Sequence, residues 1–281
     1  MNRYIDLHVH STASDGTLSP AELVQEAKKA GLAAIAVTDH DSVGGIREAL
    51  DAGNVYGLEV VPGIELSTEY ADTEIHVVGL FIDPDNHLLN EQIRAFVDNR
   101  DNRNLKIIEK LQAAGFSITA EEIYRRNPGS VIARPHIARY LVDTGQAKDV
   151  KTVFNKYIGD GCPCFVDRFK ITPMRAVELI HAAGGTAVLA HPCLYKMSRE
   201  TLIRMIEEML IPGLDGIEAV YSCNQGSDEK DYREIAEKYG LLLSGGSDFH
   251  GANKPHIHLG TGRGNLHVPY EFLEQIKESR R

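Results

Sequence analysis

Histidines and carboxylates recur at the ends of short apolar segments of this 281-residue chain. The first segment ends in Asp6-Leu7-His8-Val9-His10, and side-chain alternation along a strand puts His8 and His10 on one face, where both can bind one metal ion. The other candidate ligands are Asp15, His40, Glu65, His76, His191, Asp248 and His250. Imidazole and carboxylate groups together suit zinc, manganese or iron. Nine candidates are more than one ion needs, so the pattern predicts two or three divalent ions.

Each of these residues has an ordinary structural alternative. A single histidine such as His76 or His191 is more often hydrogen-bonded structure than a ligand, and Asp15 or Glu65 could cap a turn. Independent structural histidines would not all fall at strand ends on one side of a fold. The joint pattern therefore favours a metal site.

Short β-rich segments alternate with helices along the chain, and these elements must position the candidate ligands. We expect strands near 4–8, 32–37, 58–64, 74–81, 185–190, 216–221 and 241–244, and helices near 19–29, 46–52, 173–183, 199–209, 228–239 and 270–278. Apolar strands that alternate with helices predict a parallel sheet covered by helices, which commonly closes into a barrel. Functional groups of parallel barrels gather at the carboxyl ends of the strands, where the nine candidates lie.

Residues near 100–165 interrupt this alternation and are predicted to form helices without a central strand. We expect a barrel domain made of 1–100 and 166–281, with 101–165 as a helical insertion domain. The chain has a net charge of −10, yet residues 94–170 carry fourteen Lys/Arg and nine Asp/Glu, a net of +5. A basic segment in an acidic chain suggests a surface that meets an anion, although a solvated helical face would look the same.

Composition excludes other classes of protein. Hydrophobic residues make up 43% of the chain, as in ordinary globular proteins, and no apolar stretch is long enough to span a membrane. The amino-terminal segment does not look like a signal peptide, so we expect a cytoplasmic protein. The four cysteines, among them Cys162 and Cys164, match neither a redox nor a zinc motif and are expected to be reduced thiols.

Five motifs together resemble the polymerase and histidinol phosphatase (PHP) family of metal-dependent phosphoesterases. They are Asp6-Leu-His8-Val-His10-Ser11, Thr38-Asp-His40, Gly63-Ile-Glu65, Ala190-His-Pro192 and Gly246-Ser-Asp248-Phe-His250, and the match spans roughly 1–90 and 170–270. The resemblance implies an α/β fold, a distorted (β/α)7 barrel, with a trinuclear metal site. It assigns His8, His10, Glu65 and Asp248 to one ion, Glu65, His76 and His191 to a second, and Asp15, His40 and His250 to a third. Many members have histidine in place of Asp15, and a harder aspartate favours manganese or magnesium over zinc or iron(II).

The segment Ala133-Arg134-Pro135-His136 resembles the branch that includes the nucleoside 3′,5′-bisphosphate phosphatases, some relatives of which trim RNA from its 5′ end. In that branch the insertion covers the active site and contributes phosphate contacts. Arg134 and His136 are the corresponding candidates here, with Arg168 and Lys170 as weaker ones. Surface solvation is the alternative for all four residues.

The resulting hypothesis is hydrolysis of the 3′-phosphate of a nucleoside 3′,5′-bisphosphate by attack of a metal-bound hydroxide. Asp39 is expected to orient a ligand or, alternatively, to act as a general acid. Two enzymatic alternatives are 5′→3′ exonuclease activity on short RNA and histidinol-phosphate phosphatase activity. A metal- or nucleotide-binding regulator is the non-enzymatic one. The expected partners are a nucleotide substrate or short RNA, with no membrane and no obligatory protein partner.

Overall fold

The computed structural model describes residues 3–127, 132, 134–167 and 170–280. It separates into two compact units, one formed by Met1–Glu91 with Lys170–Arg281 and the other by Gln92–Phe169. Each unit has its own hydrophobic core. Among the described residues, none of the helices is long and apolar enough to cross a lipid bilayer.

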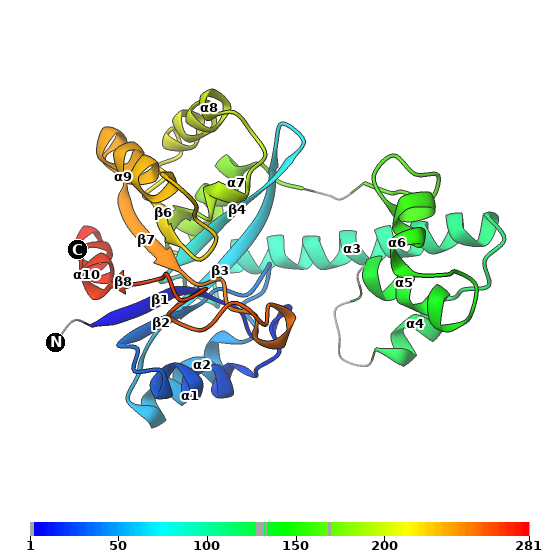
Figure 1. Ribbon diagram of the computed structural model, residues 1–281, viewed down its shortest axis with the longest axis horizontal. Coiled ribbons are helices and arrows are strands. Elements are labelled where there is room, and N and C mark those ends of the chain that lie inside the picture. Colours follow the sequence, from blue (N-terminus) through cyan, green and yellow to red (C-terminus); the bar gives the residue numbers. More distant parts are fainter. Residues whose placement is uncertain (1–2, 128–131, 133, 168–169, 281) are drawn as a thin grey trace. The chain divides into compact units, whose positions relative to one another are not determined.

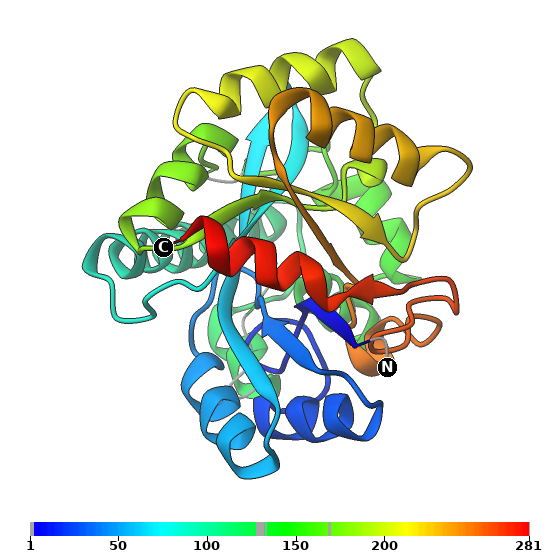
Figure 2. The same cartoon turned by 90° about the vertical axis from the view of Figure 1, so that its left-hand side faces the viewer.

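One eight-stranded sheet forms the centre of the first unit (Figures 1 and 2). Its strands, in the order in which they pair, are β7 (Leu242–Gly246), β6 (Gly216–Tyr221), β5 (Thr186–Leu189), β4 (Thr73–Leu80), β3 (Glu59–Tyr70), β2 (Ala34–Val37), β1 (Tyr4–Val9) and β8 (Val268–Pro269). The pairs β1–β2, β2–β3, β5–β6 and β6–β7 are parallel. Apolar side chains of β1, β2 and β5, including Ile5, Ala34 and Val188, pack into one core.

The sheet nearly closes because β1 also lies against β7. The N–H of Asp248 donates to the carbonyl of His8 (2.8 Å), and the N–H of His10 donates to the carbonyl of Phe249 (2.9 Å). Gly246 permits this approach, since a Cβ at that position would lie 2.3 Å from the Cβ of His8. The expected distorted α/β barrel is thus confirmed, with β8 as a short antiparallel addition beside β1.

Strand β4 departs from the expected parallel arrangement, since it runs antiparallel to both β3 and β5. It follows β3 directly through a tight hairpin in which Ala71 and Asp72 have φ angles of 48° and 59°. A chain that reverses in two residues can only pair antiparallel. In this register His76 faces Ser67, two residues beyond Glu65 on β3, so His76 and Glu65 share one face of the sheet.

Helices cover the outside of this sheet. They are α1 (Pro20–Lys29), α2 (Ile46–Tyr56), α7 (Pro173–Ala182), α8 (Arg199–Leu210), α9 (Asp228–Tyr239) and α10 (Tyr270–Ser279). The expected capping box is present at α1, where Ser19 accepts from the N–H of Glu22 and the Glu22 carboxylate accepts from the N–H of Ser19. Figure 1 shows α1 and α2 side by side next to β2, and α9 beside β6.

The second unit is helical in its described residues. Helix α3 (His87–Ala113) runs into it from the first unit and is followed by α4 (Ala120–Arg126), α5 (Arg134–Asp143), α6 (Val150–Val153) and a π-helical turn (Phe154–Ile158). Ile107, Leu111, Ile137 and Leu141 lie in its core. The expected helical character of the insertion is confirmed.

Candidate metal centre

All nine predicted ligands lie in one cluster. Most of them lie near the carboxyl ends of the parallel strands or in the loops that follow, whereas Glu65 lies within β3 and His76 within the antiparallel strand β4. Four overlapping groups have their donor atoms within 4.8 Å of one another. They are His10, Asp15, His40 and His250; His8, Glu65 and His191; His8, His10 and Asp248; and His40, Glu65 and His76. Because the groups share members, neighbouring ions in this cluster would share ligands.

Glu65, fully buried on β3, is the centre of the cluster. Its Oε1 lies 2.9 Å from His76 Nδ1 and 2.9 Å from His191 Nε2, and its Oε2 lies 3.2 Å from His8 Nε2, 3.3 Å from His10 Nε2 and 3.0 Å from His40 Nδ1. Five imidazoles therefore face a single carboxylate. A carboxylate that has nitrogen donors around both oxygens can bridge two cations.

The other side of the cluster is built on His250 and the two aspartates. His250 Nε2 lies 3.2 Å from Asp15 Oδ1, and His250 Nδ1 lies 3.3 Å from Asp248 Oδ1. Asp248 Oδ1 is also 3.4 Å from His10 Nε2, so His10 lies between Glu65 and Asp248. The stacked rings of His10 and His250, with centroids 4.0 Å apart, hold this arrangement together.

Several buried donor and acceptor atoms of the cluster have no hydrogen-bond partner among the described residues. They are Nε2 of His8, both ring nitrogens of His10, Nδ1 of His40, Oε2 of Glu65 and Nδ1 of His191. An unpartnered buried polar atom costs about 1–3 kcal/mol, so native proteins rarely leave one without a reason. Imidazole nitrogens and carboxylate oxygens are the donors that zinc, manganese and iron bind, and the residues present therefore fit divalent metal ions.

Charge inside the cluster is strongly polarised. Burial alone would raise the pKa of Glu65, but the imidazoles of His40, His8 and His76 hold it well below its usual value. Burial opposes protonation of His76 as well, yet the Glu65 carboxylate wins and raises the pKa of His76 to about 10. A metal ion that binds His76 would therefore have to displace a proton from its imidazole.

Backbone strain marks three positions where the strands end. His191, Asp248 and Asp41 have φ angles of 23°, 58° and 48°, in a region that residues with a Cβ rarely adopt. Such conformations cost about 1–3 kcal/mol each and are found mostly at functional sites. Two of the three are ligand candidates, and Asp41 directly follows His40.

Asp39, one residue before His40, holds the loop that carries Asp15. Its Oδ1 accepts from the N–H of Ser11 (2.8 Å) and the hydroxyl of Ser14 (2.7 Å), and its Oδ2 accepts from the hydroxyl of Ser11 (2.7 Å). All three of these hydrogen bonds tie the buried carboxylate to the loop between Ser11 and Ser14. This geometry favours a positioning role over the general-acid alternative.

Sequence reasoning missed three side chains that contact the cluster. Glu218 and Tyr221, both buried on β6, contact His8 and Asp248 respectively, and Lys254 Nζ lies 2.7 Å from Asp248 Oδ2. The only sequence signal for Glu218 is a lone carboxylate in the otherwise apolar strand Gly216–Tyr221. An acid that is buried in a strand requires partners, and this signal could have identified it.

Three of the four phosphate-binding candidates lie among the described residues. Arg134 and His136 lie on α5 in the second unit, where Arg134 donates to the carbonyl of Ile158 (3.2 Å) and to Asp160 (3.1 Å). Lys170 forms an ion pair with Glu69, and Arg168 lies outside the described residues. Phosphate binding by these residues stays a prediction.

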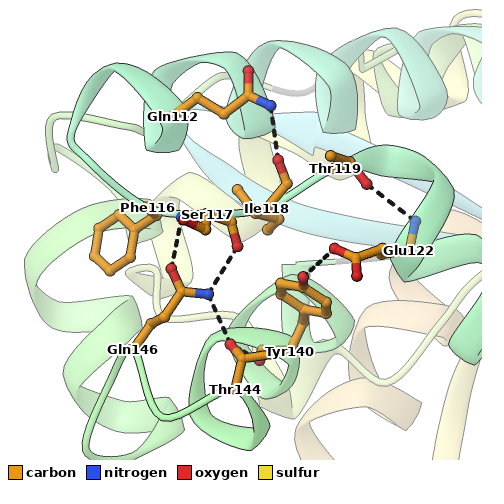
Figure 3. A pocket seen from close by; sticks show the side chains of 9 residues that line it. All are labelled: Gln112, Phe116, Ser117, Ile118, Thr119, Glu122, Tyr140, Thr144 and Gln146. Carbon is orange, nitrogen blue, oxygen red and sulfur yellow. Dashed lines mark hydrogen bonds between the residues drawn. The ribbon is translucent and has the colours of Figure 1, made fainter.

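The second unit also has an open polar pocket of about 650 Å³ (Figure 3). Gln146 bridges its wall by accepting from the N–H of Ser117 (2.6 Å) and donating to the carbonyl of the same residue (2.8 Å). The Tyr140 hydroxyl donates to Glu122 across the pocket. These bonds join α5 and the loop after it to α4 and the loop before it, so the pocket's polar groups stabilise the unit.

Comparisons with known proteins place the chain in a family. The sequence model of one protein family, the PHP domain, matches residues 6–128 of this chain. The chain is 38% identical over 248 residues to the 3′,5′-nucleoside bisphosphate phosphatase of Chromobacterium violaceum, an alignment that covers 88% of this chain and 87% of that protein. It is 37% identical over 251 residues to a 5′-3′ exoribonuclease of Haemophilus influenzae, covering 89% of this chain and 91% of the other.

A solved structure is similar over almost the whole chain. It is that of a protein from Bifidobacterium adolescentis described as a metal-dependent phosphoesterase, with a TM-score of 0.79 and 29% sequence identity. The match covers 99% of this chain and 96% of that one. The similarity therefore includes both compact units.

Proposed function

The chain belongs to the PHP family, and from this premise we propose that it is a metal-dependent phosphoesterase that removes the 3′-phosphate of nucleoside 3′,5′-bisphosphates. One observation carries the proposal: Glu65 and eight other imidazole and carboxylate groups form one cluster and leave buried nitrogens unpartnered. The Chromobacterium violaceum relative, which aligns over 88% of the chain, supports the choice of substrate.

We assign two or three divalent ions to this cluster, with manganese as the first choice and zinc, iron(II) or magnesium as alternatives. His8, His10 and Asp248 would hold one ion, and Asp15, His40 and His250 another, with His10 within reach of both. Glu65 would connect the first ion to one held with His76 and His191. The chemistry that such ions supply is Lewis-acid stabilisation of the charge on the phosphoryl oxygens and activation of water.

One side of the cluster is closed to solvent and the other is accessible. His8, His10 and Glu65 are fully buried and form its floor. The side chains of Asp15, His40 and His76 are 56%, 26% and 17% exposed and form its open edge. A phosphate group would therefore approach past these three residues. Asp39 keeps this edge in place because it holds Ser14, the neighbour of Asp15.

A second candidate activity is 5′→3′ exonucleolytic cleavage of short RNA. The Haemophilus influenzae relative, an exoribonuclease that aligns over 89% of the chain, supports it. Both activities hydrolyse phosphoesters of ribonucleotides, so one metal centre can serve either. Substrate length distinguishes them.

The test is a side-by-side assay of phosphate or nucleotide release with Mn²⁺. The substrates are adenosine 3′,5′-bisphosphate, histidinol phosphate and a 5′-phosphorylated oligoribonucleotide. We expect adenosine 3′,5′-bisphosphate to be the best of the three, and expect the double variant His8→Ala/His10→Ala to lose both bound metal and activity. His87→Ala, an exposed histidine at the start of α3, is the control. Unchanged metal content and activity in the double variant would contradict the proposal.

We further propose, from the family resemblance and the positive charge of residues 94–170, that Arg134 and His136 bind substrate phosphate. Arg134→Ala should then raise the KM for the bisphosphate about tenfold or more and leave the metal content unchanged. Arg139→Ala, on the same helix and close to Asp143, is the matched control. Equal KM values in the two variants would overturn the assignment.

A further inference from the structure

Strand β6 contributes none of the nine candidate ligands, although it lies between β5, which leads to His191, and β7, which leads to Asp248. Two of its side chains nevertheless reach the cluster. Glu218 and Tyr221 are only 2% and 4% exposed. A buried carboxylate and a buried phenol in one short strand both need hydrogen-bond partners.

An irregularity in the strand explains how both side chains reach the same side. On β6, Glu218 pairs with Ser244 of β7 and Tyr221 pairs with Gly246, so three steps along β6 match two steps along β7. Ala219 is the extra residue of a β-bulge. Residues 244 and 246 share a face of β7, and paired residues point the same way, so Glu218 and Tyr221 share a face as well. Without the bulge, simple alternation would place them on opposite faces.

Glu218 fixes the orientation of His8. Its carboxylate lies 3.1 Å and 3.3 Å from His8 Nδ1, and its Oε2 accepts the backbone N–H of His191 at 2.8 Å. A carboxylate at Nδ1 holds the proton there and leaves the lone pair on Nε2. Nε2 of His8 is the unpartnered atom that faces Glu65.

Tyr221 has the corresponding effect on Asp248. Its hydroxyl donates to Oδ2 of Asp248 at 2.7 Å, and Lys254 Nζ lies 2.7 Å from the same oxygen. Only Oδ1 then remains directed towards His10 and His250. Asp248 is thereby limited to one ligating oxygen.

We propose that Glu218 and Tyr221 are positioning residues of the metal centre, brought to one face by the bulge at Ala219, which select Nε2 of His8 and Oδ1 of Asp248 as the atoms that bind the ions. The inference rests on the proposed function only in that the cluster binds metal. It predicts an effect on metal affinity that can be measured without any substrate.

The same unit offers a matched control for each residue. Asp215 Oδ2 accepts from Nε2 of His181 (2.8 Å) and from the N–H of Ala187 (2.7 Å), the same combination of ring and backbone donors as at Glu218. The Tyr270 hydroxyl donates to Oε2 of Glu59 (2.6 Å), as Tyr221 does to Asp248. Neither control pair includes a candidate ligand.

The experiment compares Glu218→Gln and Tyr221→Phe with Asp215→Asn and Tyr270→Phe in the full chain. Calorimetric titration of the metal-stripped proteins with Mn²⁺ gives the affinity, and the visible absorption of the Co²⁺-loaded proteins reports the ligand geometry. We expect Mn²⁺ binding to weaken about 10- to 100-fold in Glu218→Gln and roughly 3- to 10-fold in Tyr221→Phe, with an altered Co²⁺ spectrum in both. The controls should bind like the wild type.

Wild-type Mn²⁺ affinity and an unchanged Co²⁺ spectrum in both β6 variants would overturn the inference while the proposed function stands. Equal losses in the controls would also overturn it, since the effect would then be general destabilisation. A wild-type protein that binds no Mn²⁺ would overturn the inference and the proposed function together. If Glu218→Gln does not fold, Tyr221→Phe alone decides the outcome, because removing one hydroxyl preserves the packing of the ring.

Discussion

Nε2 of His8 lies 3.2 Å from Oε2 of Glu65, and neither atom has a hydrogen-bond partner among the described residues. Both atoms are completely buried. A histidine and a carboxylate that were only structural partners would align for a charge-assisted hydrogen bond. This pair instead forms, with His191, a group whose possible ligand atoms all lie within 4.8 Å of one another, as ligands of one ion do.

The first prediction concerns Glu65 itself. Glu65→Gln keeps the size of the side chain but removes the charge that faces five imidazoles. It also replaces one carboxylate oxygen with an NH2 group, so the side chain can no longer bridge two ions. We expect the variant to lose at least one bound ion and about 100-fold or more of its phosphoesterase activity. Elemental analysis and a phosphate-release assay measure these two effects.

Glu59→Gln is the control for that variant because Glu59 is the first residue of β3 and contacts Tyr270 and Lys277 rather than the cluster. It should retain metal and activity. Full metal content in Glu65→Gln would rule out the central role of Glu65.

The second prediction is a change in pH dependence on metal removal. Glu65 raises the pKa of His76 from 6.5 to about 10 in the ion-free protein. A raised folded-state pKa contributes stability that is fully present below pH 6.5 and is lost as the pH rises through about 10. The Tm of metal-stripped protein should therefore fall over this interval, by about 2–4 °C for each 1 kcal/mol lost.

In metal-loaded protein the neutral imidazole is the ligating form, so the same pH rise should leave the Tm unchanged or increase it. Thermal melts of the metal-stripped and the metal-loaded protein, recorded between pH 6.5 and about pH 10, compare the two pH dependences of the Tm. A His76→Gln variant should show a smaller fall without metal. A metal-stripped wild type that becomes more stable as the pH rises would contradict this account.

The third prediction separates the two roles considered for Asp39. Asp39→Asn retains only one accepting oxygen for the three donors from Ser11 and Ser14, so we expect a loss of about 1–3 kcal/mol in the free energy of unfolding. A positioning residue should leave the shape of the pH–kcat profile intact. Loss of the alkaline limb in the variant would instead identify Asp39 as the general acid.

Most of the nine candidate ligands could be selected from sequence because they lie near the end of an apolar strand or in the loop that follows, whereas Glu65 and His76 lie within β3 and β4. Alternation in β1 places His8 and His10 on one face, and parallel strands bring their carboxyl ends to one edge, so spacing alone predicts that His8, His10 and His191 meet. These relationships depend on strand periodicity, which is visible in the residue types.

The side chains that orient the ligands could not be predicted in the same way. A period of two puts Glu218 and Tyr221 on opposite faces, and nothing in Gly216–Tyr221 marks Ala219 as a bulge. The reversed direction of β4 depends on the left-handed conformations of Ala71 and Asp72, a backbone region that residues with a Cβ adopt uncommonly. Both features arise from pairing with neighbouring strands rather than from local preference.

The fourth prediction tests the closure of the barrel, which brings β7 against β1. A Cβ at Gly246 would lie 2.3 Å from the Cβ and 2.6 Å from the backbone nitrogen of His8, and backbone atoms cannot move aside as a flexible side chain can. Gly246→Ala should therefore separate the strands, lower stability by about 1–3 kcal/mol or more, and weaken metal binding because Asp248 moves away from His8. Gly44→Ala, whose new Cβ would have only the Ser42 hydroxyl nearby, at 3.4 Å, should change neither property. Denaturant unfolding measures the stability of the two variants, and Mn²⁺ titration measures their metal affinity. A Gly246→Ala protein with wild-type stability and metal affinity would show that the contact between β1 and β7 does not hold the ligands together.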